Sequence, residues 1–341
     1  MKNIYVILAV CTMLFSACET DFDVNAEWEE TTVVYGLLDA SDQNPLQKIK
    51  ISKAFLGNMD AYQMAQYSDS INYGVNELDV KIYKWGFNQI EDSVELVAVP
   101  TYRDGEVFYD SIIVYQFVND NYLEKGFDYE LVVKNNESGN IVNSRTSIID
   151  KEPAWYNFNP DYSIGFYKND LSEFWFKTIG WNKVAEGNLY QLNLIFKYLE
   201  INKETLIEEE KSIEWLQDLK SSSSGPMSLK LEGEDFFDFL ANEIKIDNDV
   251  IRKYEGLFLE MTVGSEDLET YINVNKPITG IVQQRPMFTN INNGIGLFSS
   301  RFIYTQKIGP SNDELGGLNE GSHYYINNIL NRNFDYPFED K

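Results

Sequence analysis

The sequence has 341 residues and a formal net charge of −26, with 54 acidic side chains against 28 Lys and Arg. Binding to nucleic acid through its phosphates requires clustered Lys and Arg. The sequence after residue 18 contains no such cluster, so nucleic acid is excluded as a partner. Hydrophobic residues make up 43% and aromatic residues 14% of the chain, which favours β-strands and supplies core material for two domains or one large one.

The N-terminal segment has the pattern of a bacterial lipoprotein signal. Lys2 precedes an apolar run over 4–14, which is too short to cross roughly 30 Å of hydrocarbon. The Ser-Ala-Cys sequence that ends at Cys18 resembles the lipobox cut by signal peptidase II. We therefore expect residues 1–17 to be a signal peptide that is removed and Cys18 to carry a covalent lipid. A cleaved secretory signal without lipid is the alternative.

Residues 18–30 are polar and acidic, and we expect them to form a lipidated tether between the membrane and the folded body. Glu19, Asp21 and Asp23 resemble the acidic export signal of some Bacteroidota lipoproteins. An ordinary solvated linker is the other interpretation. The sequence thus predicts attachment to the outer membrane, with the cell surface favoured over the periplasmic face.

Residues 31–150 are predicted to form an N-terminal β-sandwich of immunoglobulin or fibronectin type. Short stretches of alternating apolar and polar residues are separated by turn residues, and 135–140 has the composition of a hairpin turn. The segment 59–67 interrupts the pattern as a short helix or ordered loop. The expected strands are 31–38, 48–54, 78–85, 94–99, 112–117, 129–134 and 141–149.

Pro153 marks the predicted domain boundary, because proline cannot continue a central strand. If the chain only bends there, both halves form one continuous sandwich. Residues 151–341 are otherwise predicted to be a second β-rich domain with helical insertions near 206–219 and 234–254. Its expected strands are 173–179, 189–200, 227–231, 256–263, 270–275 and 297–305.

The residues that usually carry catalysis or bind metals are scarce. Cys11 lies in the signal and Cys18 is the lipid site, so no disulfide and no thiolate zinc site is expected. His323 is the one histidine, and no nucleophile motif accompanies it. The oxygen-rich segments 119–121 and 247–249 lack the rest of an EF-hand, so they are interpreted as turns or helix caps. We expect no catalysis, no metal and no cofactor beyond the lipid. A hydrolase that uses only carboxylates is the alternative.

Two glycine pairs, 294–296 and 316–317, lack the sequence context of a phosphate-binding loop. They are interpreted as turns or as close approaches of the backbone.

Aromatic residues are concentrated just after the predicted boundary. Trp155, Tyr156 and Trp175 are the candidate ligand-binding residues, because rings at a domain junction can stack on a sugar or a peptide. Ordinary packing between domains is the alternative.

The lipobox at Cys18, the strand Val-Val-Tyr-Gly-Leu-Leu-Asp at 33–39 and the segment Asn-Gly-Ile-Gly-Leu-Phe-Ser-Ser at 293–300 together resemble a family of uncharacterised Bacteroidota outer-membrane lipoproteins. Their genes often neighbour those of TonB-dependent receptors, and the family carries no assigned site residues. The resemblance implies a non-catalytic accessory or structural component of an envelope complex, with a TonB-dependent receptor as partner. The alternative is a surface lipoprotein that binds a glycan or peptide through the aromatic junction.

Overall fold

The computed structural model describes residues 31–41, 45–54, 71–102, 111–221, 224–277, 287–310 and 316–335. The predicted signal peptide, Cys18, the predicted acidic tether and the predicted element at 59–67 lie outside the described residues. The all-β class is confirmed, since strands organised in several sheets dominate and the helices are few and short.

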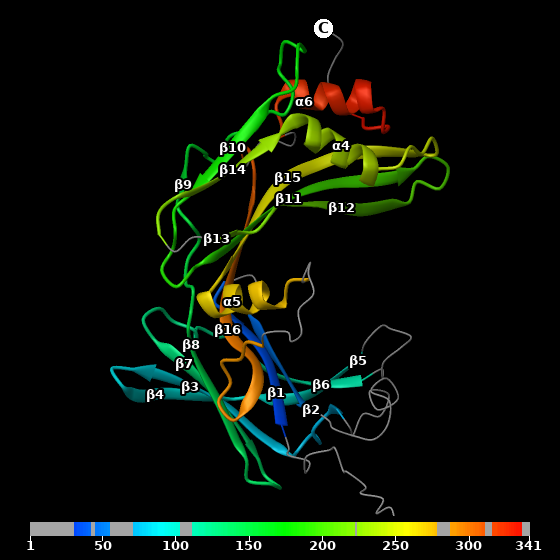
Figure 1. Ribbon diagram of the computed structural model, residues 1–341. Helices are drawn as coiled ribbons and strands as arrows, with labels where there is room; N and C mark the ends of the chain where they lie inside the picture. The colour runs from blue at the N-terminus through cyan, green and yellow to red at the C-terminus, as the bar shows by residue number, and fades with distance from the viewer. Residues whose placement is uncertain are drawn as a thin grey trace, which may run out of the picture.

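The first part of the chain forms a two-layer sandwich, as predicted, which we call the sandwich unit (Figure 1). One layer has the order β5-β6-β2-β1-β16 and the other β4-β3-β7-β8. Alternate side chains of both layers meet in one core that includes Val34, Ile82 and Phe298. Its strands are β1 (Thr31–Asp39), β2 (Leu46–Ala54), β3 (Leu78–Gly86), β4 (Gln89–Glu95), β5 (Val97–Tyr102), β6 (Ser111–Val118), β7 (Asp128–Asn135), β8 (Ile141–Ser147) and the first half of β16 (Gly294–Lys307).

The strand predicted at 94–99 is two strands in the structure. β4 ends at Glu95 and β5 begins at Val97, and the chain passes from one layer to the other between them. Leu96 makes this crossing: its side chain is buried in the core and its N–H donates to the carbonyl of Val80 at 2.9 Å. Pro100 lies in β5 at the edge of the sheet, where its missing N–H interrupts no ladder on the open side.

The second part of the chain, the distal unit, covers one face of a sheet with a smaller sheet and helices (Figure 1). The larger sheet is the continuation of the sandwich layer, in the order β12-β11-β15-β16. It comprises β11 (Leu189–Asn202), β12 (Glu208–Leu216), β13 (Lys220–Ser221), β15 (Val250–Gly264) and the second half of β16. The covering layer comprises β9 (Trp155–Tyr156), β10 (Phe176–Trp181), β14 (Met227–Glu232), α4 (Gly233–Glu243), α6 (Glu320–Tyr324) and the π-helix η1 (Tyr325–Leu330).

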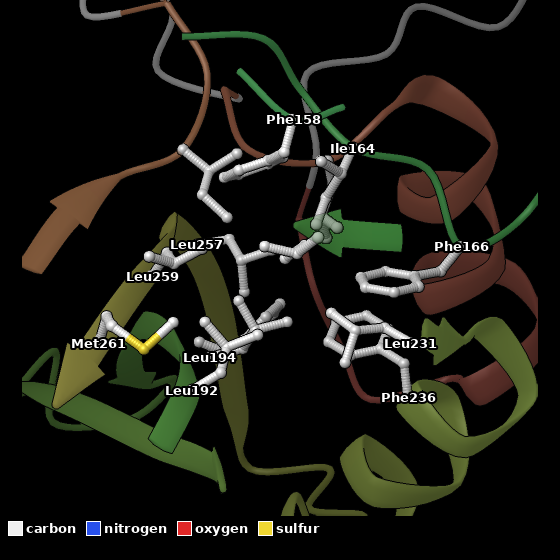
Figure 2. Packing of buried hydrophobic residues seen from close by; sticks show 14 of the residues in the cluster. Phe158, Ile164, Phe166, Leu192, Leu194, Leu231, Phe236, Leu257, Leu259 and Met261 are labelled. Carbon is white, nitrogen blue, oxygen red and sulfur yellow. The ribbon is translucent and has the colours of Figure 1, made fainter. Parts of the chain in front are cut away.

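Large rings fill the space between these layers (Figure 2). Phe236 of α4 stacks on Phe166 with ring centroids 4.2 Å apart, and both side chains are fully buried. Leu192 and Leu194 of β11 and Leu257 of β15 meet them from the sheet side. α4 is amphipathic, so its apolar side closes the core while its acidic residues stay outside.

β16 joins the two units. Residues 294–301 pair in parallel with β1, and residues 301–307 pair antiparallel with β15, so one nine-stranded sheet runs through the molecule. Gly296 makes the first pairing possible: its φ is +120°, and a Cβ there would lie 1.9 Å from the carbonyl oxygen of Val34. This confirms the close backbone approach predicted for this glycine pair. Because 294–300 complete the sandwich, residues 31–150 do not form it alone.

Two predicted elements were wrong. The helix at 206–219 is the edge strand β12, in which Ile213 and Trp215 pack on the core with a two-residue period while Leu206 and Leu216 are exposed. The strand at 270–275 belongs to α5 (Glu266–Asn275), a helix capped by Ser265, whose side chain accepts from the N–H of Leu268.

The helical insertion predicted over 234–254 is helical only in its first part. α4 ends at Glu243, and β15 begins at Val250. Between them the carboxylate of Asp247 accepts from the N–H of Asp249 at 2.8 Å, which forms a turn before a strand and not the cap of a helix. Among the helices described here, none is long and apolar enough to cross a membrane.

Candidate functional site

The structure separates the aromatic residues that the sequence grouped together. Trp155 and Tyr156 form β9, where Trp155 lies opposite Trp181 of β10. Trp175 precedes the other end of β10. A strand advances about 3.3 Å per residue, which places Trp175 roughly 20 Å from Trp181. The three candidates therefore do not form one site.

Trp155 lines a small hollow at the connection between the units. Its ring centroid lies 5.6 Å from that of Phe158 and 6.4 Å from that of Tyr304. The hollow has a volume of about 370 Å³, and Glu152 and Lys183 also line it. Trp155 thus combines packing with partial access to solvent.

Tyr156 has a structural role. Its hydroxyl donates to the carbonyl of Met227 at 2.9 Å. This bond ties β9 to β14, the strand on the other side of β10. Its ring lies against Gly180, where a Cβ would come within 2.6 Å of the ring. These contacts occupy both the hydroxyl and the ring.

Trp175 is 45% exposed and stacks on Phe176, with centroids 5.2 Å apart and an interplanar angle of 22°. Lys168 Nζ lies 4.7 Å from the Trp175 ring and Lys230 Nζ lies 4.2 Å from the Phe176 ring. Cations held over ring faces shield part of the aromatic surface and leave the rest open. Trp175 is the only one of the three sequence candidates that presents a stacked, accessible ring pair.

A further hollow that the described residues form was not predicted. It has a volume of about 690 Å³ and lies between α5 and the outer face of the sandwich unit. We call it the waist pocket, because α5 lies between the two units (Figure 1). A pocket of this size, with an apolar lining and a few polar groups, is typical of ligand sites. The lining residues are Tyr35, Gly36, Leu37, Leu46, Gln47, Lys48, Leu268, Tyr271, Ile272, Leu297 and Arg301.

The charged residues that line the waist pocket are both basic, Lys48 and Arg301. Arg301 Nε lies 3.3 Å from an Asp39 carboxylate oxygen, and the Asp39 side chain is 1% exposed. Asp39 is fixed in turn, since its other oxygen accepts from the N–H of Ser41 and its backbone exchanges two hydrogen bonds with the Gln47 side chain. This network fixes the carboxylate that pairs with Arg301 by charge at the wall of the pocket.

Two tyrosines form the opposite end of the pocket. The rings of Tyr35 and Tyr271 meet edge to face, with centroids 6.0 Å apart. A hydrogen bond between their hydroxyls, reinforced by burial, raises the pKa of Tyr35 to about 12. The Tyr35 hydroxyl is therefore uncharged at neutral pH. Leu297 lies beside Tyr35 in the β1–β16 pairing and supplies apolar surface.

Polar contacts at its first turn hold α5 over the pocket. The hydroxyl of Ser265 contacts the hydroxyl of Ser299 on β16, and the N–H of Ser265 donates to the carbonyl of Ser300 at 3.2 Å. The Asn290 side chain donates both to Asp267 of α5 and to the carbonyl of Phe298, each at 2.7 Å. No residue of α5 is fully buried, so these contacts fix a helix that lies on the surface.

The other sequence candidates have structural roles. His323 is buried in α6, with its ring 5.0 Å from that of Tyr254. Asn119 accepts from the N–H of Leu123 at 2.9 Å, as expected for a turn. Across the described parts of the chain, no group of three or more His, Cys, Asp or Glu side chains is placed to hold a metal ion.

Comparison with known proteins gives little further information. No protein-family model and no curated protein matches the sequence. Among solved structures, the chain is similar to the C-terminal globular domain of the oligosaccharyltransferase from Pyrococcus abyssi, with 13% identity and a TM-score of 0.24. The match covers 69% of this chain and 46% of that one, so the chain spans less than half the length of this structure. A likeness at this level carries no functional argument.

Proposed function

We propose that this chain is a non-catalytic lipoprotein of the outer membrane, anchored through Cys18, that acts as an accessory or structural component of an envelope complex. The expected partner is a TonB-dependent receptor at the cell surface. The observation that supports a binding role is the waist pocket, an open hollow of about 690 Å³ where two units share one sheet. A hollow of this kind at the junction of two units is suited to hold a ligand or a segment of a partner.

The topology also gives the proposed anchor a direction. Thr32 pairs with Gly294 at the end of the sandwich unit that is remote from the distal unit, and Asp39 pairs with Arg301 at the junction. Arg301 also faces Gly264 of the distal unit. β1 thus begins at the far end of the sandwich unit. An anchored molecule would extend the distal unit away from the membrane.

The first experiment is purification of the full chain, tagged at its C-terminus, from its native envelope in mild detergent. The expected result is recovery of an outer-membrane receptor and sensitivity of the chain to protease on intact cells. A Cys18→Ala chain should lose both the membrane fraction and the receptor. Repeated recovery of the wild-type chain as a free monomer would overturn the accessory role.

A second candidate function is recognition of a surface glycan or peptide, and the exposed Trp175–Phe176 pair favours it. Stacked rings bind the apolar faces of sugars and extended peptides, and the topology places this pair on the unit farther from the proposed anchor. Trp175→Ala should abolish binding to an immobilised glycan or peptide array. Trp155→Ala, which changes a packed ring, is the matched control and should retain binding if folded. Equal binding by wild type and Trp175→Ala would remove this candidate.

A further inference from the structure

We propose that the waist pocket binds a ligand that has one carboxylate on an apolar body. The carboxylate lies between Lys48 and Arg301, and the apolar body lies over Leu297 and the inner side of α5. This site does not depend on the receptor partner proposed above. The ligand is either a free small carboxylate or the C-terminal residue of a peptide, which share this chemistry.

The charge of the lining is the first argument. Acidic residues outnumber basic ones by 54 to 28 in this chain, yet the charged residues among the described lining of the pocket are Lys48 and Arg301. Asp39 neutralises one of these two charges, because it pairs with Arg301 from within the protein. A net positive charge remains at the wall. In an acidic molecule, such a locally positive hollow selects an anionic group and orients it.

The geometry of Arg301 is the second argument. Its Nε lies 3.3 Å from a carboxylate oxygen of the buried Asp39, an ion pair without a hydrogen bond from Nε. A guanidinium offers five N–H donors in a rigid fork that matches a carboxylate, and one edge remains for a ligand when the other is paired. Lys48 lies on the neighbouring strand β2 and adds a mobile ammonium group to the same wall. A carboxylate is therefore recognised by shape as well as by charge.

The remaining wall favours an apolar body on the ligand. Leu297 and Arg301 lie four residues apart on β16, a distance of about 13 Å along the strand. Leu268 and Ile272 of α5 line the pocket together with Leu297, and Tyr35 lies beside Leu297. These side chains favour an apolar body about 10 Å long, with a tyrosine hydroxyl at its far end as a hydrogen-bond donor.

The test is calorimetric titration of the mature chain, with Cys18→Ser so that no detergent is needed, at neutral pH. The probes are octanoate, 4-phenylbutanoate and the peptide N-acetyl-Leu-Phe with a free C-terminus, each beside its primary amide. We expect at least one acid to bind about tenfold or more tightly than its amide, since a charged hydrogen bond contributes on the order of 1.5–3 kcal/mol. Binding of octanoate or 4-phenylbutanoate indicates a free carboxylate, and binding of the peptide alone indicates a C-terminus.

Matched variants locate the site. Lys48→Gln should weaken binding of the acid at least about fivefold, and Lys134→Gln, the same change at an exposed position of the other sandwich layer, should leave it unchanged. Ile272→Trp should fill the pocket and abolish binding. Arg301→Gln alone would leave the buried Asp39 carboxylate without its ion-pair partner. The double variant Asp39→Asn/Arg301→Gln removes both charges. When folded, it should lose the preference for acid over amide.

Two results would overturn the proposal. One is equal affinity for acids and amides, and the other is no binding of any probe by a folded wild-type chain. Neither result bears on recovery of the receptor, so the two proposals fail separately.

Discussion

The two units solve the same packing problem with different side chains. In the sandwich unit, two pleated layers interlock through aliphatic residues such as Val34, Ile49 and Val133. In the distal unit, a sheet faces helices and irregular chain, and rings such as Phe166, Phe236 and Phe196 fill the larger gaps. The sandwich core contains rings as well, such as Tyr129 and Phe298, but the distal core holds more of them. The comparison teaches that an irregular cover relies more on bulky rings than two facing pleated layers do.

The largest expected effect tests the ring-filled core. Phe236→Ala removes a fully buried ring that stacks on Phe166 and also contacts Trp215, and it should destabilise the chain by about 3–5 kcal/mol. Hydrogen exchange should show lost protection in α4 and β11 while β3 and β7 keep theirs. The control is Phe87→Ala, because Phe87 is fully exposed and its loss should change stability by less than about 0.5 kcal/mol. Equal loss of protection in both units would contradict separate cores.

The next effect tests the strand that joins the units. Gly296→Ala places a Cβ against the Val34 carbonyl. The free energy of unfolding, measured in urea, should fall by about 3 kcal/mol. Gly139→Ala is the matched control, since Gly139 also has a positive φ but no atom within 4 Å of its Cβ position, and it should cost about 1 kcal/mol. Similar losses in the two variants would show that the β1–β16 approach is not under steric constraint.

Two buried tyrosines, one in each unit, differ in the hydrogen bonding of their hydroxyls, and the difference in stability can be measured at neutral pH. Tyr190 of the distal unit accepts from the N–H of Val184 at 3.0 Å and donates to the carbonyl of Gly187 at 3.1 Å. Tyr190→Phe should therefore cost about 1–3 kcal/mol. Tyr115 of the sandwich unit has a buried hydroxyl that makes no hydrogen bond to the described residues, so Tyr115→Phe should change stability by less than about 1 kcal/mol. A larger loss for Tyr115→Phe would reverse this ranking.

The same residue predicts a response to alkali. Burial, followed by the negative charge of Glu77, raises the pKa of Tyr115 to about 12. An unfolded tyrosine ionises near pH 10, so the neutral form contributes its full stability below about pH 10 and this contribution is lost as the pH rises toward about 12. Chemical unfolding from pH 9 to 12 should show a smaller decline for Tyr115→Phe than for wild type. An unchanged decline would assign the alkaline sensitivity to other tyrosines.

The smallest effect concerns the helix between the units. Ser265→Ala removes the cap of α5 and its contact with Ser299. The variant should lower the free energy of unfolding by about 1 kcal/mol. Exchange should accelerate in α5 and leave both cores protected, because no residue of α5 is fully buried. The exposed Ser93 provides the control, and Ser93→Ala should leave exchange in α5 unchanged.

Strong two-residue alternation made most strands predictable. Residues 190–194 alternate between apolar and polar, and β11 (Leu189–Asn202) forms there, with Leu192, Leu194 and Phe196 on its buried face. β12 was missed because Ile213, which lies on its buried face, also fits a helical stripe with Leu206, Leu216 and Leu219. Pairing with β11 decided the outcome, and a pairing partner is not visible in local sequence. For α5, the signal was present as Ser265 followed by acidic residues, which is a helix start.

The candidate site was less predictable than the fold. The aromatic residues were predicted to bind ligand because they are concentrated in one part of the sequence. In the structure, Trp155 and Trp175 lie at opposite ends of β10. The waist pocket combines Tyr35, Lys48 and Tyr271 with Arg301, residues that are distant in sequence. Only the parallel pairing of β1 with β16 brings Arg301 beside Asp39, and no local pattern indicates such a long-range pair.

The position of β16 has a consequence for how the chain folds during synthesis. Synthesis runs from the N-terminus, so β1 leaves the ribosome long before the strand that completes its sheet. Until residues 294–300 arrive, one edge of β1 offers unpaired backbone groups to any other strand. We expect the nascent sandwich to need shielding by a chaperone until its last strand is delivered. A chain that terminates before Gly294 should aggregate even though every other strand of the sandwich is intact.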